Sequence, residues 1–191
     1  MNKKQLIVTS TLLSLMLLLA ITQGLFKDNF EQVIFMNQGI SEFKEYNFDN
    51  NNYIISLPNE WIVDEKENKG QYISYKLNFK DKNNKINGLV EVINTKEDLN
   101  VFAENDLNNQ YLDYYNSEII PFKNSNNSGV LAQYETVIRN GYDFKNECYY
   151  LSLDEGKTLK ILFNLNEKSY KENMKTILNA IISSIKTQSK K

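Results

Sequence analysis

The chain has 191 residues, of which 41% are apolar and 12% aromatic, a content that can bury one core and hardly two. Its formal net charge is −2 and Arg139 is its one arginine, so the basic surface that DNA or RNA binding requires is missing. Nucleic acid is therefore not expected as a partner. The abundance of asparagine, and of lysine over arginine, is typical of an AT-rich, bacterial genome.

The clearest functional signal is the uncharged, apolar segment of residues 6–26. At about 1.5 Å per residue, a helix of this length spans a hydrocarbon layer roughly 30 Å thick. A cleaved signal peptide and a buried helix of a soluble protein are the alternatives, but the best cleavage site, Thr22-Gln23-Gly24, is a poor one. We therefore expect a retained transmembrane signal anchor.

The charges around this segment set its expected direction. Residues 1–5 contain two lysines, whereas Lys27 is offset by Asp28 and Glu31. By the positive-inside rule, residues 1–5 are expected in the cytoplasm and everything after the segment outside it. The expected localisation is the cell membrane, as a single-pass protein with an extracytoplasmic C-terminal domain.

Residues 27–45 mix charged and apolar side chains and predict a juxtamembrane linker, either a short amphipathic helix continuing from the membrane or a stalk. From Tyr46 the apolar residues recur with a period of two, which places the start of the folded domain there. We expect this domain to cover residues 46–187, and residues 188–191 to form a loose basic tail.

Strand patterns fill most of the domain. "YNFD" and "YIISLP" predict an opening hairpin whose second strand ends at Pro58, and "QYISYKLNF" and "INGLVEVIN" predict a second pair. "SEIIPF" predicts an edge strand or the end of a strand, because Pro121 cannot donate a ladder hydrogen bond. "GVLAQYETVI", "YDFKNECYYLSL" and "TLKILFNL" predict a meander with Asn140-Gly141 and "DEGK" at its turns. The residues expected to alternate inward along its first strand are Val130, Ala132, Tyr134, Thr136 and Ile138.

Apolar residues at helical spacing predict two helices that pack on the sheet. The first is expected to begin with Thr95 and Asp98 as a capping box, and the second, over about residues 167–186, with Ser169 and Glu172. The apolar stripe of the first helix is Leu99, Phe102, Ala103, Leu107, Tyr111 and Tyr114. That of the second is Tyr170, Met174, Ile177, Leu178, Ile181 and Ile185.

This order of elements predicts an α+β fold, an antiparallel β-sheet with flanking helices. The stretch "ISLPNEW", a strand ending in proline with tryptophan three residues later, resembles the start of the PsbP-like superfamily. "GYDFKNECYYLSLDEGKTLKILFNL" and the final "IISSIK" resemble that family's closing meander and helix. The resemblance covers about residues 46–187 and implies an α-β-α sandwich.

The resemblance implies an accessory or binding module, often outside the cytoplasm, and no single activity. Photosynthetic members assist a manganese and calcium centre, but this sequence has no histidine, and no metal-binding residue is carried over. No cofactor is predicted. Trp61 is expected to be a core anchor over the sheet, with stacking on a ligand as the alternative.

The absence of histidine removes most catalytic motifs. Serine and cysteine nucleophiles lack their usual base, and zinc lacks a usual ligand. Cys148, the only cysteine, can form no intrachain disulfide and lies too far downstream for a lipid anchor, so it is predicted to be buried apolar filler. "EGKT" at residues 155–158 predicts a hairpin turn, because Leu151 stands where a phosphate loop needs its first glycine.

Carboxylates leave one catalytic alternative. Glu97, Asp98, Glu104 and Asp106 surround the first predicted helix, where a pair of acids could serve a glycosidase, although a solvated helix face is the plainer interpretation. The runs "DNNN" and "DKNNK" are turn sequences and not a calcium loop.

The sequence therefore predicts no catalytic, cofactor-binding or metal site. It predicts a membrane-anchored, extracytoplasmic, non-catalytic binding or accessory domain, with a cell-envelope hydrolase using acidic residues as the alternative. The expected partners are the membrane, through the N-terminal helix, and an envelope protein, an envelope polymer or a small ligand.

Overall fold

The computed structural model describes residues 3–66, 72–138, 141–153 and 156–187 of a chain that divides into two units, Met1–Ile40 and Ser41–Lys191. The first unit is one helix, α1 (Lys3–Asn37). Its Lys3–Ala20 segment is long and apolar enough to cross a membrane, and none of that segment is buried. The helix includes the first part of the predicted linker, and Gly39 follows its end at a φ of 72°, which glycine adopts without strain.

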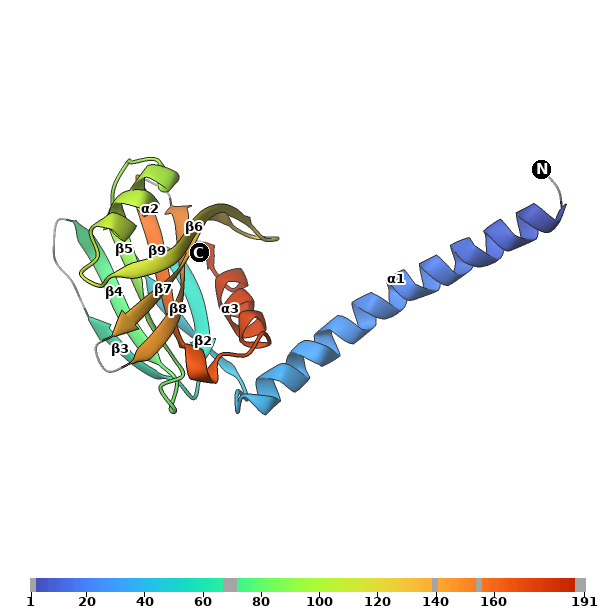
Figure 1. The fold of residues 1–191 in the computed structure, drawn as a ribbon, viewed down its shortest axis with the longest axis horizontal. Helices are drawn as coiled ribbons and strands as arrows, with labels where there is room; N and C mark the ends of the chain where they lie inside the picture. The colour runs from blue at the N-terminus through green and yellow to red at the C-terminus, as the bar shows by residue number, and fades with distance from the viewer. Residues whose placement is uncertain (1–2, 67–71, 139–140, 154–155, 188–191) are drawn as a thin grey trace. The chain divides into compact units, whose positions relative to one another are not determined.

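The second unit is built on two antiparallel sheets (Figure 1). The small sheet has the order β1-β2-β10 and the large sheet the order β3-β4-β5-β9-β8-β7-β6. The small sheet contains β1 (Phe43–Phe48), β2 (Tyr53–Pro58) and β10 (Lys186–Thr187). The large sheet contains β3 (Ile62–Lys66), β4 (Ile73–Lys80), β5 (Ile86–Asn94), β6 (Tyr114–Lys123), β7 (Ser128–Ile138), β8 (Tyr142–Leu153) and β9 (Lys157–Asn166). With α2 (Leu99–Asn108), the 3-10 turn η1 (Glu167–Ser169) and α3 (Met174–Ser183), they confirm the α+β class with flanking helices.

The opening hairpin is confirmed, with Phe48 opposite Tyr53. Its turn places Asp49, Asn50 and Asn51 at positive φ values of 50°, 56° and 64°, a conformation that these short polar side chains tolerate better than other non-glycine residues. Asp49 is also buried there, and both its carboxylate oxygens lie 2.9 Å from Lys157 Nζ on β9. The turn is thereby tied to the large sheet.

Trp61 is a core residue, as predicted. β2 ends at Pro58, the Trp61 amide donates to the Pro58 carbonyl at 3.0 Å, and the indole is 8% exposed and stacks on Phe79 at 5.4 Å. The strand β3, which begins directly after Trp61, was not predicted. Its five residues are too few, and its Ile62 too exposed, for a clear alternating pattern.

The strands β4 to β9 follow the prediction closely, whereas the short β10 was not predicted. β4 pairs with β5, β7 to β9 form the meander, and β6 with Pro121 is an edge strand. Asn140 and the first half of "DEGK" lie outside the described residues, while Gly141 and Gly156 beside them have φ values of 74° and 71°. Ile138 is exposed, contrary to the expected alternation.

The start of the first helix was wrongly predicted. Asp98 is itself the N-cap of α2, and its carboxylate accepts from the amides of Asn100 and Val101 at 2.9 and 3.4 Å. Thr95 instead accepts from the amide of Glu97 in a local turn. Two good capping residues three positions apart leave the sequence ambiguous.

The far end of that helix was also wrongly predicted. α2 ends at Asn108, so Tyr111 and Tyr114, the last two residues of the expected stripe, lie beyond it. Tyr111 is fully exposed and Tyr114 begins β6.

The closing helix is shorter than predicted. Ser169 ends η1, and α3 begins after Asn173, which makes no side-chain capping bond, so the expected box of Ser169 and Glu172 is absent. Met174, Ile177, Leu178 and Ile181 form the buried side of α3, Ile185 is buried just beyond it, and Tyr170 lies before it.

Asparagines of the β6–β7 loop hold the C-terminal end of α3. The side-chain amide of Asn126 donates to the Ser183 carbonyl at 2.8 Å, and that of Asn127 donates to the Ile182 carbonyl at 3.0 Å. These carbonyls belong to the last turn, where no intrahelical donor is available. Asparagine has a specific structural role here, beyond any genomic bias.

The two faces of the large sheet are covered differently. On one face α2 packs on β6 to β8, where its Phe102, Ala103 and Leu107 join one apolar cluster. The opposite face carries the alternate buried residues Leu77, Phe79, Val90, Val92, Leu159, Ile161, Phe163 and Leu165. Trp61 stacks on that face, and α3 lies beside β2 (Figure 1).

Candidate functional site

The helix α2 covers only half of its face of the large sheet. Its main contacts are with β6, β7 and β8, and the apolar cluster under it extends to Ile73 of β4, Ile93 of β5 and Leu162 of β9. Beyond this cluster, the same side of the sheet is formed by β3, β4, β5 and β9. We call the side chains that these four strands present there the open face. By the strand registers they are Ile62, Asp64, Lys76, Asn78, Lys80, Asn87, Leu89, Glu91, Lys160, Leu162 and Asn164.

Polar pairs across neighbouring strands order the open face. Lys76 and Glu91 are opposite each other on β4 and β5 and form an ion pair of 2.7 Å. Asn87 and Asn164 are opposite each other on β5 and β9, and their side chains are joined by a hydrogen bond of 2.9 Å. Such directly opposed pairs fix side-chain positions before any ligand arrives.

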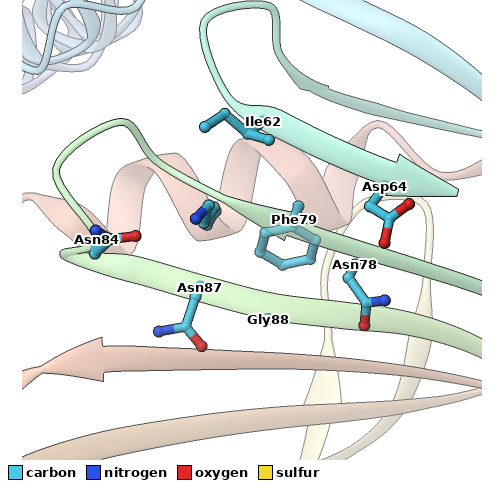
Figure 2. A pocket seen from close by; sticks show the side chains of 8 residues that line it. Ile62, Asp64, Asn78, Phe79, Asn84, Asn87 and Gly88 are labelled. Atoms are coloured by element: carbon cyan, nitrogen blue, oxygen red, sulfur yellow. The ribbon is translucent and has the colours of Figure 1, made fainter.

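One hollow of about 450 Å³ lies at the β3 side of the open face. It is lined by Ile62, Asp64, Asn78, Phe79, Lys80, Asn84, Asn87 and Gly88. Figure 2 shows Asp64 and Asn78 close together on adjacent strands, with Asn87 extending from the next strand. Its one carboxylate and its amides can form hydrogen bonds, but they offer no pair of acids.

A second hollow, of about 350 Å³, lies where the C-terminal end of α2 meets the open face. We call it the α2 pocket. It is lined by Asp106, Leu107, Asn109, Gln110, Tyr111, Leu112, Tyr134, Lys160 and Leu162. These residues come from α2, the loop that follows it, and strands β7 and β9, so the pocket exists only in the folded domain.

A partly buried ion pair forms the polar side of the α2 pocket. Lys160 Nζ lies 2.7 and 2.9 Å from the two carboxylate oxygens of Asp106, and the Tyr150 hydroxyl donates to Asp106 at 2.6 Å. The side chains of Lys160 and Asp106 are 14% and 28% exposed. Burial and the charge of Asp106 raise the pKa of Tyr150, so the phenol remains a hydrogen-bond donor.

The mouth of the pocket combines apolar and amide groups. Tyr111 is fully exposed and Leu112 is exposed, which is unusual for adjacent large apolar side chains. Next to them, the side-chain nitrogen of Gln110 is buried without a hydrogen-bond partner. An unpaired buried donor is costly, so this end of the α2 pocket is held at some expense in stability.

Cys148 is buried filler, as predicted. It lies in the apolar cluster under α2, is fully buried, and is a free thiol. Burial raises the pKa of this thiol to about 12. A thiol that remains protonated at neutral pH is not a nucleophile.

The four acids of the first predicted helix have separate positions. Asp98 caps α2, Glu97 accepts a hydrogen bond from Asn105 at 3.0 Å, and Glu104 is exposed. Among them Asp106 lines the α2 pocket, and it is paired with Lys160. Within the described residues, no group of three or more acidic or cysteine side chains could hold a metal ion.

The other two motifs, "EGKT" and "DKNNK", lie at turns between strands. In "EGKT", Glu155 lies outside the described residues, while Lys157 pairs with Leu153 across the β8–β9 hairpin and binds Asp49, as a turn and not a phosphate loop would place it. In "DKNNK", Asp81 accepts from the amide of Ile86 at 2.9 Å, which is turn chemistry. The pairing of Asp106 with Lys160 joins residues 54 positions apart, and no local pattern in the sequence indicates it.

No protein-family model and no curated protein matches the sequence. Solved structures of other proteins resemble this chain in fold. The solution structure of cyanobacterial PsbP, CyanoP from Synechocystis sp. PCC 6803, superposes with a TM-score of 0.54 at 12% identity, over 78% of this chain and 94% of that one. The fold is PsbP-like. The yeast Ran-binding protein Mog1p from Saccharomyces cerevisiae gives a TM-score of 0.50 at 10% identity, over 76% of this chain and 95% of that one.

Proposed function

We propose that this PsbP-like chain is a membrane-anchored, extracytoplasmic domain that binds a ligand or partner without catalysing a reaction. The observation that carries the proposal is the state of Asp106. It is the one carboxylate lining the α2 pocket, and it is held by Lys160 and Tyr150. A glycosidase needs two carboxyl groups about 5 to 10 Å apart in one site, one of them a proton donor.

The open face gives the domain a surface suited to binding. Two hollows lie on it, and its polar side chains are already paired in fixed positions. Pre-ordered polar groups reduce the entropy lost on binding. That a solved structure with this fold is a Ran-binding protein supports the use of the fold as a binding module.

The proposed location rests on α1. Its apolar segment Lys3–Ala20 is exposed along its whole length, as a segment surrounded by lipid would be. Lysines at the N-terminal end of α1 favour the cytoplasmic side for that end. The domain of residues 41–191 would then lie outside the cytoplasm, held near the membrane by a retained signal anchor.

Protease protection in spheroplasts tests this proposal. Full-length protein with a C-terminal tag should fractionate with membranes, and protease added outside should remove the tag. Protection of the tag in intact spheroplasts, with digestion only after lysis, would overturn the topology. Recovery of the chain in the soluble extract without residues 6–26 would show cleavage and overturn the anchor.

A further inference from the structure

We propose that the α2 pocket binds one neutral sugar ring of a cell-envelope glycan. The inference rests on the proposed binding function and names the ligand class of that same surface. Four features of the pocket support it: its balanced charge, its exposed aromatic rim, its polar wall and its size.

The charge of the pocket favours an uncharged ligand. Lys160 and Asp106 neutralise each other at 2.7 Å, and both are largely removed from solvent. An anionic ligand drawing Lys160 away would leave Asp106 without its counterion, and a cationic ligand would do the reverse, each at a high electrostatic cost. Hydroxyl groups can donate to Asp106 and accept from Lys160 without separating the pair.

The rim of the pocket favours a ligand with apolar faces. Tyr111 presents a fully exposed ring and Leu112 an exposed side chain, and Tyr134 lines the interior. A pyranose ring has C–H groups on its faces and hydroxyl groups at its edges. It can therefore stack on Tyr111 while its edge reaches the polar side of the pocket.

The polar side of the pocket disfavours a purely apolar ligand. Such a ligand would desolvate the ion pair of Asp106 and Lys160 and would supply no hydrogen bond in return. Asn109 and Gln110 line the pocket beside this pair and add to its polar wall.

The volume sets the size of the bound group. The pocket measures about 350 Å³, near the lower end of the roughly 300 to 1,000 Å³ of small-molecule sites. One ring of a longer chain fits this size better than a whole oligosaccharide. The open face continues past Leu162 to Leu89 and Asn78, and gives the rest of a glycan a surface with both apolar and polar groups.

The test uses the full-length chain in lauryldimethylamine oxide micelles, whose detergent has no sugar head group. Titration calorimetry is run with chitotriose and maltotriose as neutral probes and with trigalacturonic acid as the charged one. A neutral trisaccharide should bind, and Tyr111→Ala should weaken its binding about tenfold or more, as truncating an aromatic anchor does. Tyr111→Phe should retain most of the affinity, because stacking needs the ring and not the hydroxyl.

The matched control is Tyr46→Ala on β1 of the small sheet, which should bind like the unmodified protein. Three results would overturn the sugar site and leave the binding function standing. They are equal affinity of Tyr111→Ala and the unmodified chain, binding of the charged probe alone, and capture of envelope proteins but no sugar. Binding of free sugars but not of the isolated insoluble glycan would overturn the assignment to the envelope. Cleavage of a probe would instead overturn the non-catalytic function and leave the sugar site standing.

Discussion

Replacing Trp61 by alanine should destabilise the domain severely. The indole is 8% exposed and stacks on Phe79 at 5.4 Å, and Phe79 in turn packs on Phe163 at 5.4 Å. Removing it leaves a cavity beside Phe79, at one end of this chain of three rings. Emptying a large aromatic site costs roughly 3 to 5 kcal/mol, a large share of the stability of about 5 to 15 kcal/mol that is typical of a domain.

The assay is urea unfolding of the full-length protein in micelles. Far-UV circular dichroism is the signal, because Trp61 is the only tryptophan and its fluorescence disappears with the substitution. Ile62→Ala is the matched control, since its side chain is 53% exposed and exposed substitutions usually change the free energy of unfolding by less than about 0.5 kcal/mol. A loss below about 1 kcal/mol for Trp61→Ala, joined with lost ligand binding, would show a surface residue that stacks on ligand and would refute the packing argument.

The structure leads to three further predictions, two on substitutions and one on the reactivity of a thiol. Asp98→Ala should cost about 1 kcal/mol of unfolding free energy and Thr95→Ala less, because Asp98 caps α2; the reverse order would restore the capping box. Asp106→Ala should lower the free energy of unfolding by roughly 3 kcal/mol, because it leaves Lys160 without its partner. Glu104→Ala on the same helix should be near neutral. Equal effects of the two substitutions would show that the ion pair is unimportant. Cys148 should resist iodoacetamide at pH 8 until the protein unfolds, because burial raises the pKa of the thiol to about 12; alkylation of folded protein would contradict its burial.

The same thiol predicts a pH dependence of stability. The unfolded thiol ionises near its ordinary pKa of 9.0, while the folded thiol holds its proton to about pH 12. Between these values the folded state binds more protons, so the contribution of Cys148 is complete below pH 9.0 and is lost as the pH rises toward 12. Cys148→Ala should reduce this slope in urea unfolding measured at successive pH values, and an unchanged slope would count against it.

The sequence predicted those elements whose signals are local. The hairpin of β1 and β2, the pair β4 and β5, and the meander of β7 to β9 each alternate over enough residues, and Pro121 restricts β6 to an edge. β3 and β10, with five and two residues, are strands because neighbouring chain segments pair with them. Tertiary pairing of this kind leaves no periodic pattern.

For the same reason, local sequence patterns could not predict the candidate site. Asp106 meets Lys160 through the register of β9 under α2, and Tyr111 is exposed because α2 ends before it. The asparagines of the β6–β7 loop read as an ordinary polar loop until α3 is placed beside them. Side chains that act across the fold cannot be assigned from their neighbours in sequence alone.

The measurement that tests the central claim most directly uses residues 41–191, the compact second unit, made without α1. The soluble fragment is incubated with isolated insoluble cell-envelope glycan, and both its co-sedimentation and the release of soluble sugar are followed. The account predicts that the fragment folds, sediments with the glycan and releases none of it. Release of soluble sugar that stops on Glu104→Gln or Asp106→Asn would show an acidic hydrolase and contradict the non-catalytic binding function.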